Sequence, residues 1–311
     1  MNKYLVTGGA GFVGSNLVQE LIKDGNEVVI VDDLSMGDLN NLKNVDSNKY
    51  TFYQRSITDK QFMEELLVKE NFDYIVLLAA VASVADSIER PYETHLINQE
   101  ANIDIIEAVR KNKLTPKKVY FASSAAVYGD EPTLPKKETS QIKPLTPYAI
   151  DKFASERYLI TYGKLYNIPT VTTRFFNVYG PNQNPSSPYS GVLSIIQDKL
   201  QKNTEFTLFG DGEQTRDFVY VKDVIQAIRI LLEDERAVYD VYNVATGTSE
   251  SLINVIHHFE KNMNKELQIQ YYPARVGDIK YSAADISKLK ALGYQPEYDL
   301  ARGLKDYITH S

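Results

Sequence analysis

Tyr148 and Lys152 are the residues of this sequence best suited to acid–base chemistry. Their four-residue spacing places both side chains on one face of a helix, and Thr146 and Pro147 before them suit the N-cap and the first helical position. Tyrosine is a poor base at neutral pH because its pKa is about 10, but a neighbouring ammonium favours the phenolate. The spacing therefore predicts a tyrosine base supported by Lys152.

Ser124 is the hydroxyl that we expect to complete this catalytic set. It follows a strand-like segment, at 118–122, and would bridge a substrate oxygen and the phenolate. A Tyr-x-x-x-Lys pair alone is often a solvated helix face. Its interpretation therefore depends on the elements that surround it.

A glycine-rich turn near the start of the chain indicates what the catalytic set works with. Gly8, Gly11 and Gly14 lie between an apolar strand-like segment, at 3–7, and a helical one. Gly8 allows a tight turn, Gly11 lets the backbone approach a pyrophosphate, and Gly14 lets the helix pack closely on the strand. The pattern predicts a dinucleotide-binding turn, and its G-x-x-G-x-x-G spacing resembles that of short-chain dehydrogenase/reductases.

The cofactor is predicted from the end of the second strand, at 27–31. Asp32 and Asp33 follow it, about twenty residues beyond the glycines, where a carboxylate accepts the hydroxyls of the adenosine ribose. Segment 32–38 contains no Arg or Lys to bind a 2′-phosphate. The sequence therefore predicts NAD rather than NADP.

Strand-like and amphipathic helical segments alternate along the chain, which predicts an α/β fold with a doubly wound parallel (Rossmann) sheet. Further strands are expected at 51–54, 74–79, 118–122, 170–174 and 238–244, and helices at 59–70, 96–113, 148–166, 190–202 and 221–234. We expect a Rossmann domain at 1–178 plus 217–245. A smaller C-terminal substrate-binding lobe, at 179–216 plus 246–311, is expected at the carboxyl edge of the sheet, weakly ordered after Thr246.

Composition excludes several classes of function. The chain has 311 residues, is 43% hydrophobic and 24% charged, and contains no cysteine, which excludes disulfides and thiolate catalysis. Of the four histidines only His257 and His258 are adjacent, and neighbouring helix positions do not face one another, so no metal site is predicted. A net charge of −7 argues against nucleic-acid and membrane partners. No charged leader precedes the first strand, and no apolar run approaches the roughly 18 residues of a membrane span, so we expect a cytoplasmic protein.

Taken together, these motifs resemble an extended short-chain dehydrogenase/reductase of the UDP-hexose 4-epimerase group over nearly the whole chain. They are T-G-G-A-G-F-V-G-S-N-L at 7–17, D-D-L-S-x-G at 32–37, Ser124 with Tyr148 and Lys152, R-F-F-N-V-Y-G-P at 174–181, G-D-G-E-Q-T-R-D-F at 210–218 and P-A-R-V-G-D at 273–278. The resemblance implies NAD contacts from Gly8, Gly11, Phe12, Val13, Gly14, Asp32, Asp33, Leu34, Ser35, Gly37, Ser56, Ile57, Leu78, Ala79, Ala80, Val81, Ala122, Tyr148, Lys152, Phe175 and Val178. Ser56 departs from the family, which often has Asp there.

The same resemblance implies a UDP-sugar substrate and a homodimer. Substrate contacts are implied for Ser83, Ser124, Ala125, Ala126, Tyr148, Asn177, Val192, Phe206, Phe209, Arg216, Arg275, Asp278 and Ser282. Arg216 and Arg275 would neutralise the diphosphate, as an anionic ligand of an acidic protein requires. Phe206 or Phe209 would stack on uracil, although either is equally typical of a core. The implied reaction oxidises C4 of the sugar through Tyr148 and NAD, and returns the hydride to the other face.

Three other readings stay open to different degrees. A nucleotide-sugar 4,6-dehydratase needs an Asp-Glu pair directly after the catalytic hydroxyl, where this chain has Ala125 and Ala126. A UDP-glucuronate 4-epimerase or a decarboxylating relative is excluded less firmly. A silent NAD-binding regulator or scaffold is disfavoured because Ser124, Tyr148 and Lys152 are all present.

Ser282 bears on the choice of sugar. It falls where relatives restricted to non-acetylated sugars carry a tyrosine, and a small residue leaves room for an N-acetyl group. The sequence thus predicts that UDP-N-acetylglucosamine and UDP-N-acetylgalactosamine are accepted alongside UDP-glucose and UDP-galactose. The alternative is a serine on an exposed turn.

Overall fold

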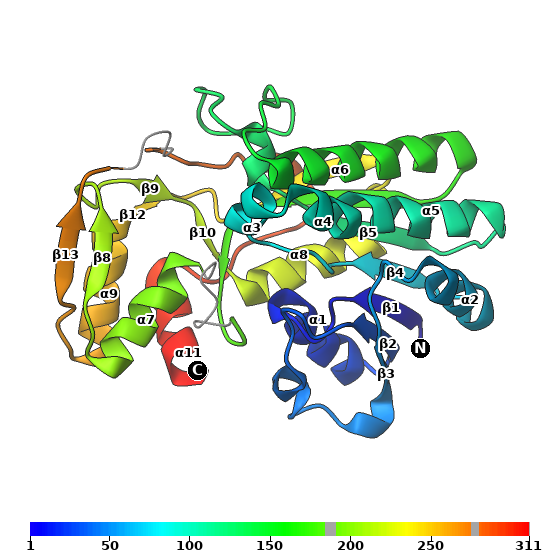
Figure 1. Ribbon diagram of the computed structural model, residues 1–311, viewed down its shortest axis with the longest axis horizontal. Coiled ribbons are helices and arrows are strands. Elements are labelled where there is room, and N and C mark those ends of the chain that lie inside the picture. The colour runs from blue at the N-terminus through cyan, green and yellow to red at the C-terminus, as the bar shows by residue number, and fades with distance from the viewer. Residues whose placement is uncertain (184–190, 275–279, 311) are drawn as a thin grey trace.

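The central element is a parallel sheet, as expected for the Rossmann fold class. The structure, a computed structural model, describes residues 1–183, 191–274 and 280–310. In this part of the chain seven strands pair in the order β11-β6-β5-β4-β1-β2-β3, all parallel. Figure 1 shows this sheet between two layers of helices. The doubly wound fold is confirmed.

The strands and helices agree closely with the segments expected as far as Val244. The sheet strands are β1 (Lys3–Thr7), β2 (Glu27–Asp32), β3 (Tyr50–Gln54), β4 (Tyr74–Leu77), β5 (Lys118–Ser124), β6 (Thr170–Phe175) and β11 (Asp240–Val244). The helices of this region are α1 (Phe12–Lys23), α2 (Lys60–Glu70), α3 (Val84–Glu89), α4 (Pro91–His95), α5 (Ala101–Lys111), α6 (Pro147–Tyr166), α7 (Val192–Lys202) and α8 (Val221–Glu233). Short helical turns are η1 (Leu39–Leu42), η2 (Ser47–Lys49), the π-turn η3 (Leu96–Glu100), which joins α4 to α5, and η4 (Ala125–Tyr128).

Alternate strand residues build two separate apolar layers. Val6, Val28 and Ile30 face a cluster that includes α1 and α8, whereas Leu5 and Val29 face a second cluster that includes α2, α5 and α6. Both layers are buried, because strands covered by helices on both sides must be apolar on both faces. This packing fixes which face of each helix meets the sheet.

The region after Thr246 is more regular than expected, so the prediction of weak order there is wrong. It contains β12 (Glu250–Ser251), α9 (Leu252–Met263), β13 (Ile269–Tyr272), α10 (Ser287–Lys290) and α11 (Leu300–His310). The buried residues of α9 are Leu252, Val255, Ile256 and Phe259, an i, i+3, i+4, i+7 pattern that predicts an amphipathic helix. The signal was therefore present in the sequence.

These elements pack with others from the middle of the chain. Strand β13 pairs with β8 (Phe206–Phe209), β12 pairs with β9 (Thr215–Arg216), and β7 (Asn177–Tyr179) pairs with β10 (Phe218–Tyr220). In Figure 1 they gather with α7, α9 and α11 at one end of the parallel sheet. The domain boundary expected at residue 178 falls inside β7, and the division into two domains stays a prediction.

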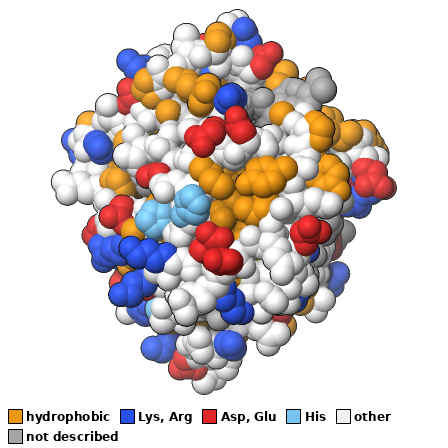
Figure 2. All heavy atoms as spheres, turned by 90° about the vertical axis from the view of Figure 1, so that its left-hand side faces the viewer, with side chains coloured by type: hydrophobic (Ala, Val, Ile, Leu, Met, Phe, Trp, Pro, Cys, Tyr) orange, Lys and Arg blue, Asp and Glu red, His pale blue; other side chains and the backbone are white. Residues whose placement is uncertain are grey.

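Figure 2 looks onto the end of the molecule that carries β8, β13 and α9, and shows an apolar patch beside histidine side chains. Strand β13 contributes the exposed Tyr271 and Tyr272, and α9 carries His257 and His258. Within the described ranges, no group of three or more His, Cys, Asp or Glu side chains is placed to bind a metal ion. Nor does any helix in these ranges have the length and apolar character needed to cross a membrane.

Candidate active site

The glycine-rich turn between β1 and α1 is built for close backbone approach. Gly8 has a φ of +71°, and a Cβ on it would lie 2.8 Å from the Ala79 backbone nitrogen. A Cβ on Gly14 would lie 2.1 Å from the Gly8 carbonyl oxygen, so α1 packs directly on the turn. Gly11 caps α1 without a side-chain hydrogen bond. The first N–H groups of α1 therefore face the turn with no side-chain cap, as an anion site requires.

A cavity of about 900 Å³ opens beside this turn, along the carboxyl ends of β1 to β4. It is lined by most of the predicted cofactor residues: Gly8, Gly11, Phe12, Val13, Gly14, Asp32, Asp33, Leu34, Ser35, Gly37, Ser56, Ile57, Leu78, Ala79, Ala80 and Val81. Ala122, Tyr148, Lys152, Phe175 and Val178 lie outside this lining. The residues present fit a dinucleotide, because they combine the glycine cradle with carboxylates at the end of β2.

Asp32 both lines the cavity and holds its wall together. Its Oδ2 accepts a hydrogen bond from Ala10 N (3.0 Å), and its Oδ1 accepts one from Leu34 N (2.9 Å). Burial raises the pKa of Asp32, and these backbone hydrogen bonds oppose the shift. A Cβ on Gly37 would lie 2.8 Å from Asp32 Oδ1, so this close approach depends on glycine. Asp33 is exposed and accepts a hydrogen bond from Ser35 N.

The catalytic set predicted from the sequence converges at the carboxyl end of β5. Helix α6 begins at Pro147, and Thr146 Oγ1 accepts a hydrogen bond from Ala149 N (3.3 Å), as the N-cap prediction expects. Tyr148 and Lys152 are 9% and 4% exposed. Ser124 is the last residue of β5. All three lie at the carboxyl end of β5. This strand pairs with β4, and the residues that follow β4 line the cavity.

The electrostatics of this set, without a cofactor, do not by themselves favour the Tyr148 phenolate. Lys152 Nζ donates to the Ala122 carbonyl (2.8 Å) and lies 5.9 Å from the centre of the Tyr148 ring. Burial raises the pKa of Tyr148, and a hydrogen bond with Ser124 opposes that shift. Burial also lowers the pKa of Lys152 to about 8. Tyr148 therefore needs positive charge beyond that of Lys152 to become a base at neutral pH.

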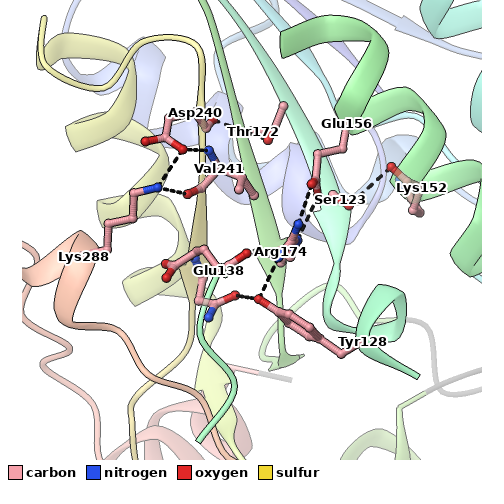
Figure 3. A network of polar contacts seen from close by, with 11 residues as sticks. Ser123, Tyr128, Glu138, Lys152, Glu156, Thr172, Arg174, Asp240, Val241 and Lys288 are labelled. Atoms are coloured by element: carbon pink, nitrogen blue, oxygen red, sulfur yellow. Dashed lines mark hydrogen bonds and ion pairs between the residues drawn. The ribbon is translucent and has the colours of Figure 1, made fainter. Parts of the chain in front are cut away.

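A buried ion pair fixes helix α6 against the sheet. Arg174 of β6 donates to Glu156 of α6 from Nη2 (2.6 Å) and Nε (3.0 Å), and its Nη1 donates to the Tyr128 hydroxyl (2.9 Å) and the Glu138 carbonyl (3.0 Å). Figure 3 shows Glu156 and Lys152 on the side of α6 that faces these strands. Glu156 lies four residues after Lys152 and eight after Tyr148, so the pair sets the rotation of the catalytic face.

A second cavity, of about 570 Å³, lies between β7, α7 and β8. The predicted substrate residues in its lining are Asn177, Val192, Phe206, Phe209 and Arg216. Phe206 is only 4% exposed and serves mainly as core, whereas Phe209 is half-buried and packs on Tyr272 with ring centres 5.9 Å apart. Phe209 is therefore the better candidate for stacking on a base. Arg275 and Asp278 lie outside the described residues.

Six predicted substrate residues in the described part of the chain line neither cavity: Ser124 and Tyr148, placed above, and Ser83, Ala125, Ala126 and Ser282. Ser83 is buried, and its hydroxyl caps α3 by accepting from Asp86 N (2.9 Å). Ala125 and Ala126 begin η4, directly after Ser124. Ser282 N donates to the Thr215 carbonyl (3.1 Å), and the Ser282 carbonyl accepts from Ser249 Oγ (2.6 Å). Ser282 is thus fixed beside the strand that carries Arg216.

The larger cavity, beside the glycine turn, is also lined by polar residues that the sequence analysis did not select. Arg55 and Asn41 contribute to its lining, as do Asn182 and Gln183. Arg55 directly follows β3, and the carboxyl ends of parallel strands share one edge, so this placement was predictable. Asn182 Nδ2 donates to Ser15 Oγ (3.0 Å) across 167 residues of sequence, a contact that no local pattern signals.

Comparison with known proteins decides the family. The model of the NAD-dependent epimerase/dehydratase family matches residues 4–245. The chain belongs to this family. It is an extended short-chain dehydrogenase/reductase, and its cofactor is NAD. The residues that line the large cavity beside the glycine turn are the candidates to hold that cofactor.

The relatives within this epimerase/dehydratase family match the chain from end to end. A putative UDP-glucose 4-epimerase of Methanocaldococcus jannaschii is 37% identical, covering 98% of this chain and 97% of the relative. The structure of a UDP-N-acetylglucosamine 4-epimerase of Methanobrevibacter ruminantium with UDP-N-acetylmuramic acid is 35% identical, with a TM-score of 0.93 and coverage of 99% and 97%. A UDP-glucuronic acid 4-epimerase of Bacillus cereus with UDP-glucuronic acid and NAD is 30% identical, with a TM-score of 0.88 and coverage of 99% and 98%. These three proteins differ in the sugar they are named for.

Proposed function

We propose that this protein is an NAD-dependent 4-epimerase of UDP-sugars, which inverts C4 through a transient 4-keto sugar. The observation that carries the proposal is the convergence of Ser124, Tyr148 and Lys152 at the end of β5, beside a cavity that fits a dinucleotide. The relatives named above, a putative UDP-glucose 4-epimerase among them, support the substrate class.

The proposed roles of the residues follow from their positions. Tyr148 takes the proton of the sugar 4-hydroxyl and later returns it, while Ser124 hydrogen-bonds the same oxygen. Lys152 contributes positive charge that favours the phenolate. Bound NAD supplies the hydride acceptor and donor.

The nucleotide part of the substrate is assigned to the second cavity. Arg216 supplies a guanidinium for the diphosphate, Asn177 contacts the same group, and Phe209 offers a ring face to uracil. Arg275 and Asp278 complete this assignment from the sequence resemblance. A tether of this kind lets the keto sugar turn while the nucleotide stays in place.

We propose a broad choice of sugar, with N-acetylhexosamines accepted alongside plain hexoses. Ser282 carries this part of the proposal. Its small side chain would leave space for the N-acetyl group of the sugar, whereas a tyrosine ring at this position would fill that space. A UDP-glucuronate 4-epimerase is the second candidate, favoured by the likeness to the Bacillus cereus enzyme. Dehydration is not proposed, because Ala125 and Ala126 supply no acid or base after Ser124.

A homodimer in the cytoplasm completes the proposal. Helix α6 exposes Ile150, Tyr158, Leu165 and Tyr166, an apolar surface suited to a second copy. The absence of cysteine suits a reducing compartment. Size-exclusion chromatography with light scattering tests the dimer, and a monomeric mass at micromolar concentration would contradict it.

The activity is tested by incubating the purified protein, without added NAD, with UDP-glucose, UDP-N-acetylglucosamine and UDP-glucuronate separately. Chromatography of the products should show the C4 epimer of the first two sugars. Conversion of UDP-glucuronate alone would replace the proposal with the second candidate. No conversion of any sugar, with NAD bound, would refute an epimerase function.

A further inference from the structure

Asp151 lies on α6 between the two predicted catalytic residues, and the mechanism above does not use it. It is 4% exposed. Its Oδ1 lies 2.8 Å from Nδ1 of His95, the last residue of α4. A carboxylate oxygen only accepts, so His95 Nδ1–H is the donor of this hydrogen bond. The pair thus links α4 to the catalytic helix.

The second carboxylate oxygen of Asp151 is unusual. Oδ2 is buried and has no hydrogen-bond partner in the described part of the chain. A buried polar atom left without a partner costs free energy, and more when the group is charged. An oxygen of this kind beside a catalytic set calls for a functional explanation.

The neighbouring Lys152 offers a functional explanation for the unpartnered oxygen of Asp151. Its ammonium is buried and donates to Ala122, and in the described ranges it forms no ion pair with Asp151. Burial lowers the pKa of Lys152, and the charge of Asp151 opposes that shift. An ion pair in direct contact would occupy the N–H groups of the ammonium. A carboxylate held at a distance supplies negative charge and leaves those donors for the site.

We propose that Asp151 and His95 are positioning residues of this site: the Asp151 carboxylate is a counterion that keeps the Lys152 ammonium charged, and His95 holds the carboxylate in place. The inference rests on the proposed function, since it assigns Lys152 the role given there. It adds two residues that the sequence analysis did not select.

Charged side chains on the elements packed against α6 have other partners. On α3 and α4, Asp86 and Glu93 contact Arg90; on α5, Glu107 contacts Arg110 and Asp104 contacts Lys60; on α6 itself, Glu156 contacts Arg174; at the start of β5, Lys118 donates to the Asp234 carbonyl. Glu89 and Glu100 are exposed. His95 is thus the ionisable side chain that contacts Asp151.

The test is the titration of Lys152 in the NAD-bound protein. Lysine side chains are labelled with ¹⁵N and ¹³C, and the Lys152 signal is assigned by its loss in Lys152→Arg. Asp151→Asn preserves shape and the acceptor for His95 but removes the charge. Removing the Asp151 charge should lower the Lys152 pKa by about one unit. The protonated fraction of Lys152 should then fall about eightfold near pH 8.5 and less than twofold near pH 6.5. Turnover should follow the same pH dependence.

Two further variants keep this test decisive. His95→Ala leaves the carboxylate in place but unheld, and should shift the Lys152 titration in the same direction by less; it also replaces Asp151→Asn if that variant fails to fold. Asp104→Asn, which removes a carboxylate from α5, should leave the titration unchanged.

The outcomes separate this inference from the proposed function. An unshifted Lys152 titration in Asp151→Asn, or a loss of turnover equal at all pH values, would show a purely structural link and overturn the inference. A shifted titration in a protein that converts no sugar would support the counterion and overturn the proposed function instead.

Discussion

Breaking the Arg174–Glu156 ion pair should destabilise the protein more than any surface ion pair would. Arg174 and Glu156 have side-chain exposures of 3% and 0%, and two hydrogen bonds of 2.6 and 3.0 Å join them. Removing one partner leaves the other charge buried and unpaired, which costs about 3–5 kcal/mol. We expect Glu156→Leu and Arg174→Met each to lower the free energy of unfolding by this amount.

The double variant Glu156→Leu/Arg174→Met gives the decisive comparison. It removes both charges and leaves only the Tyr128 hydroxyl and the Glu138 carbonyl without their donor, at about 1 kcal/mol each. It should therefore be more stable than either single variant. Urea unfolding of the NAD-free protein measures this by circular dichroism, because the chain contains no tryptophan and bound NAD would add stability of its own. Additive losses in the double variant would refute the reasoning.

Further predictions concern the site itself. Tyr148→Phe should lower turnover by at least about a hundredfold while NAD binding persists, whereas Tyr158→Phe, on the exposed side of α6, should leave turnover unchanged; equal effects would remove the base assignment. NAD should bind far more tightly than NADP because Asp32 and Asp33 repel a 2′-phosphate, and equal affinities in competition binding would contradict this. Ser282→Tyr should abolish conversion of UDP-N-acetylglucosamine and spare UDP-glucose, and an equal effect on both sugars would refute the role of Ser282. Because burial lowers the pKa of Lys152 to about 8 in the folded protein, the unfolded chain binds more protons between pH 8 and the ordinary lysine pKa of 10.5. Urea unfolding should show that the free energy of unfolding of Lys152→Met, relative to that of the unsubstituted protein, falls by up to about 3 kcal/mol as pH rises through that window. A difference that is constant with pH would refute the burial argument.

Local rules predicted the parts of the molecule that depend on local chemistry. The glycine turn, the start of α6 at Pro147 and the parallel strands up to Val244 follow from turn residues, caps and apolar runs. The cofactor cavity was predictable for a related reason. Carboxyl ends of parallel strands meet at one edge, so Asp32, Ser56 and Leu78 gather there once the strand order is known.

Contacts between distant segments were not predictable in the same way. Ala122 accepts from Lys152, Glu156 pairs with Arg174, and Asn182 reaches Ser15, each only after the sheet has brought the segments together. Helix α9 is a different case, because its apolar residues have helical spacing, and the prediction of weak order did not use that pattern. Burial of Tyr148 likewise follows from packing, and it raises the tyrosine pKa that Lys152 and a positively charged nicotinamide ring are together expected to lower.

The return of one hydride to the other face of C4 is the central claim, and an isotope label tests it most directly. The protein is incubated in ordinary water with UDP-glucose and with UDP-N-acetylglucosamine carrying deuterium at C4, and the products are examined by mass spectrometry and NMR. We predict that the inverted products retain the deuterium at C4, because a cofactor that stays bound would take up the hydride and return it without exchange with water. Loss of the label to solvent, or recovery of the sugars without inversion, would contradict the account.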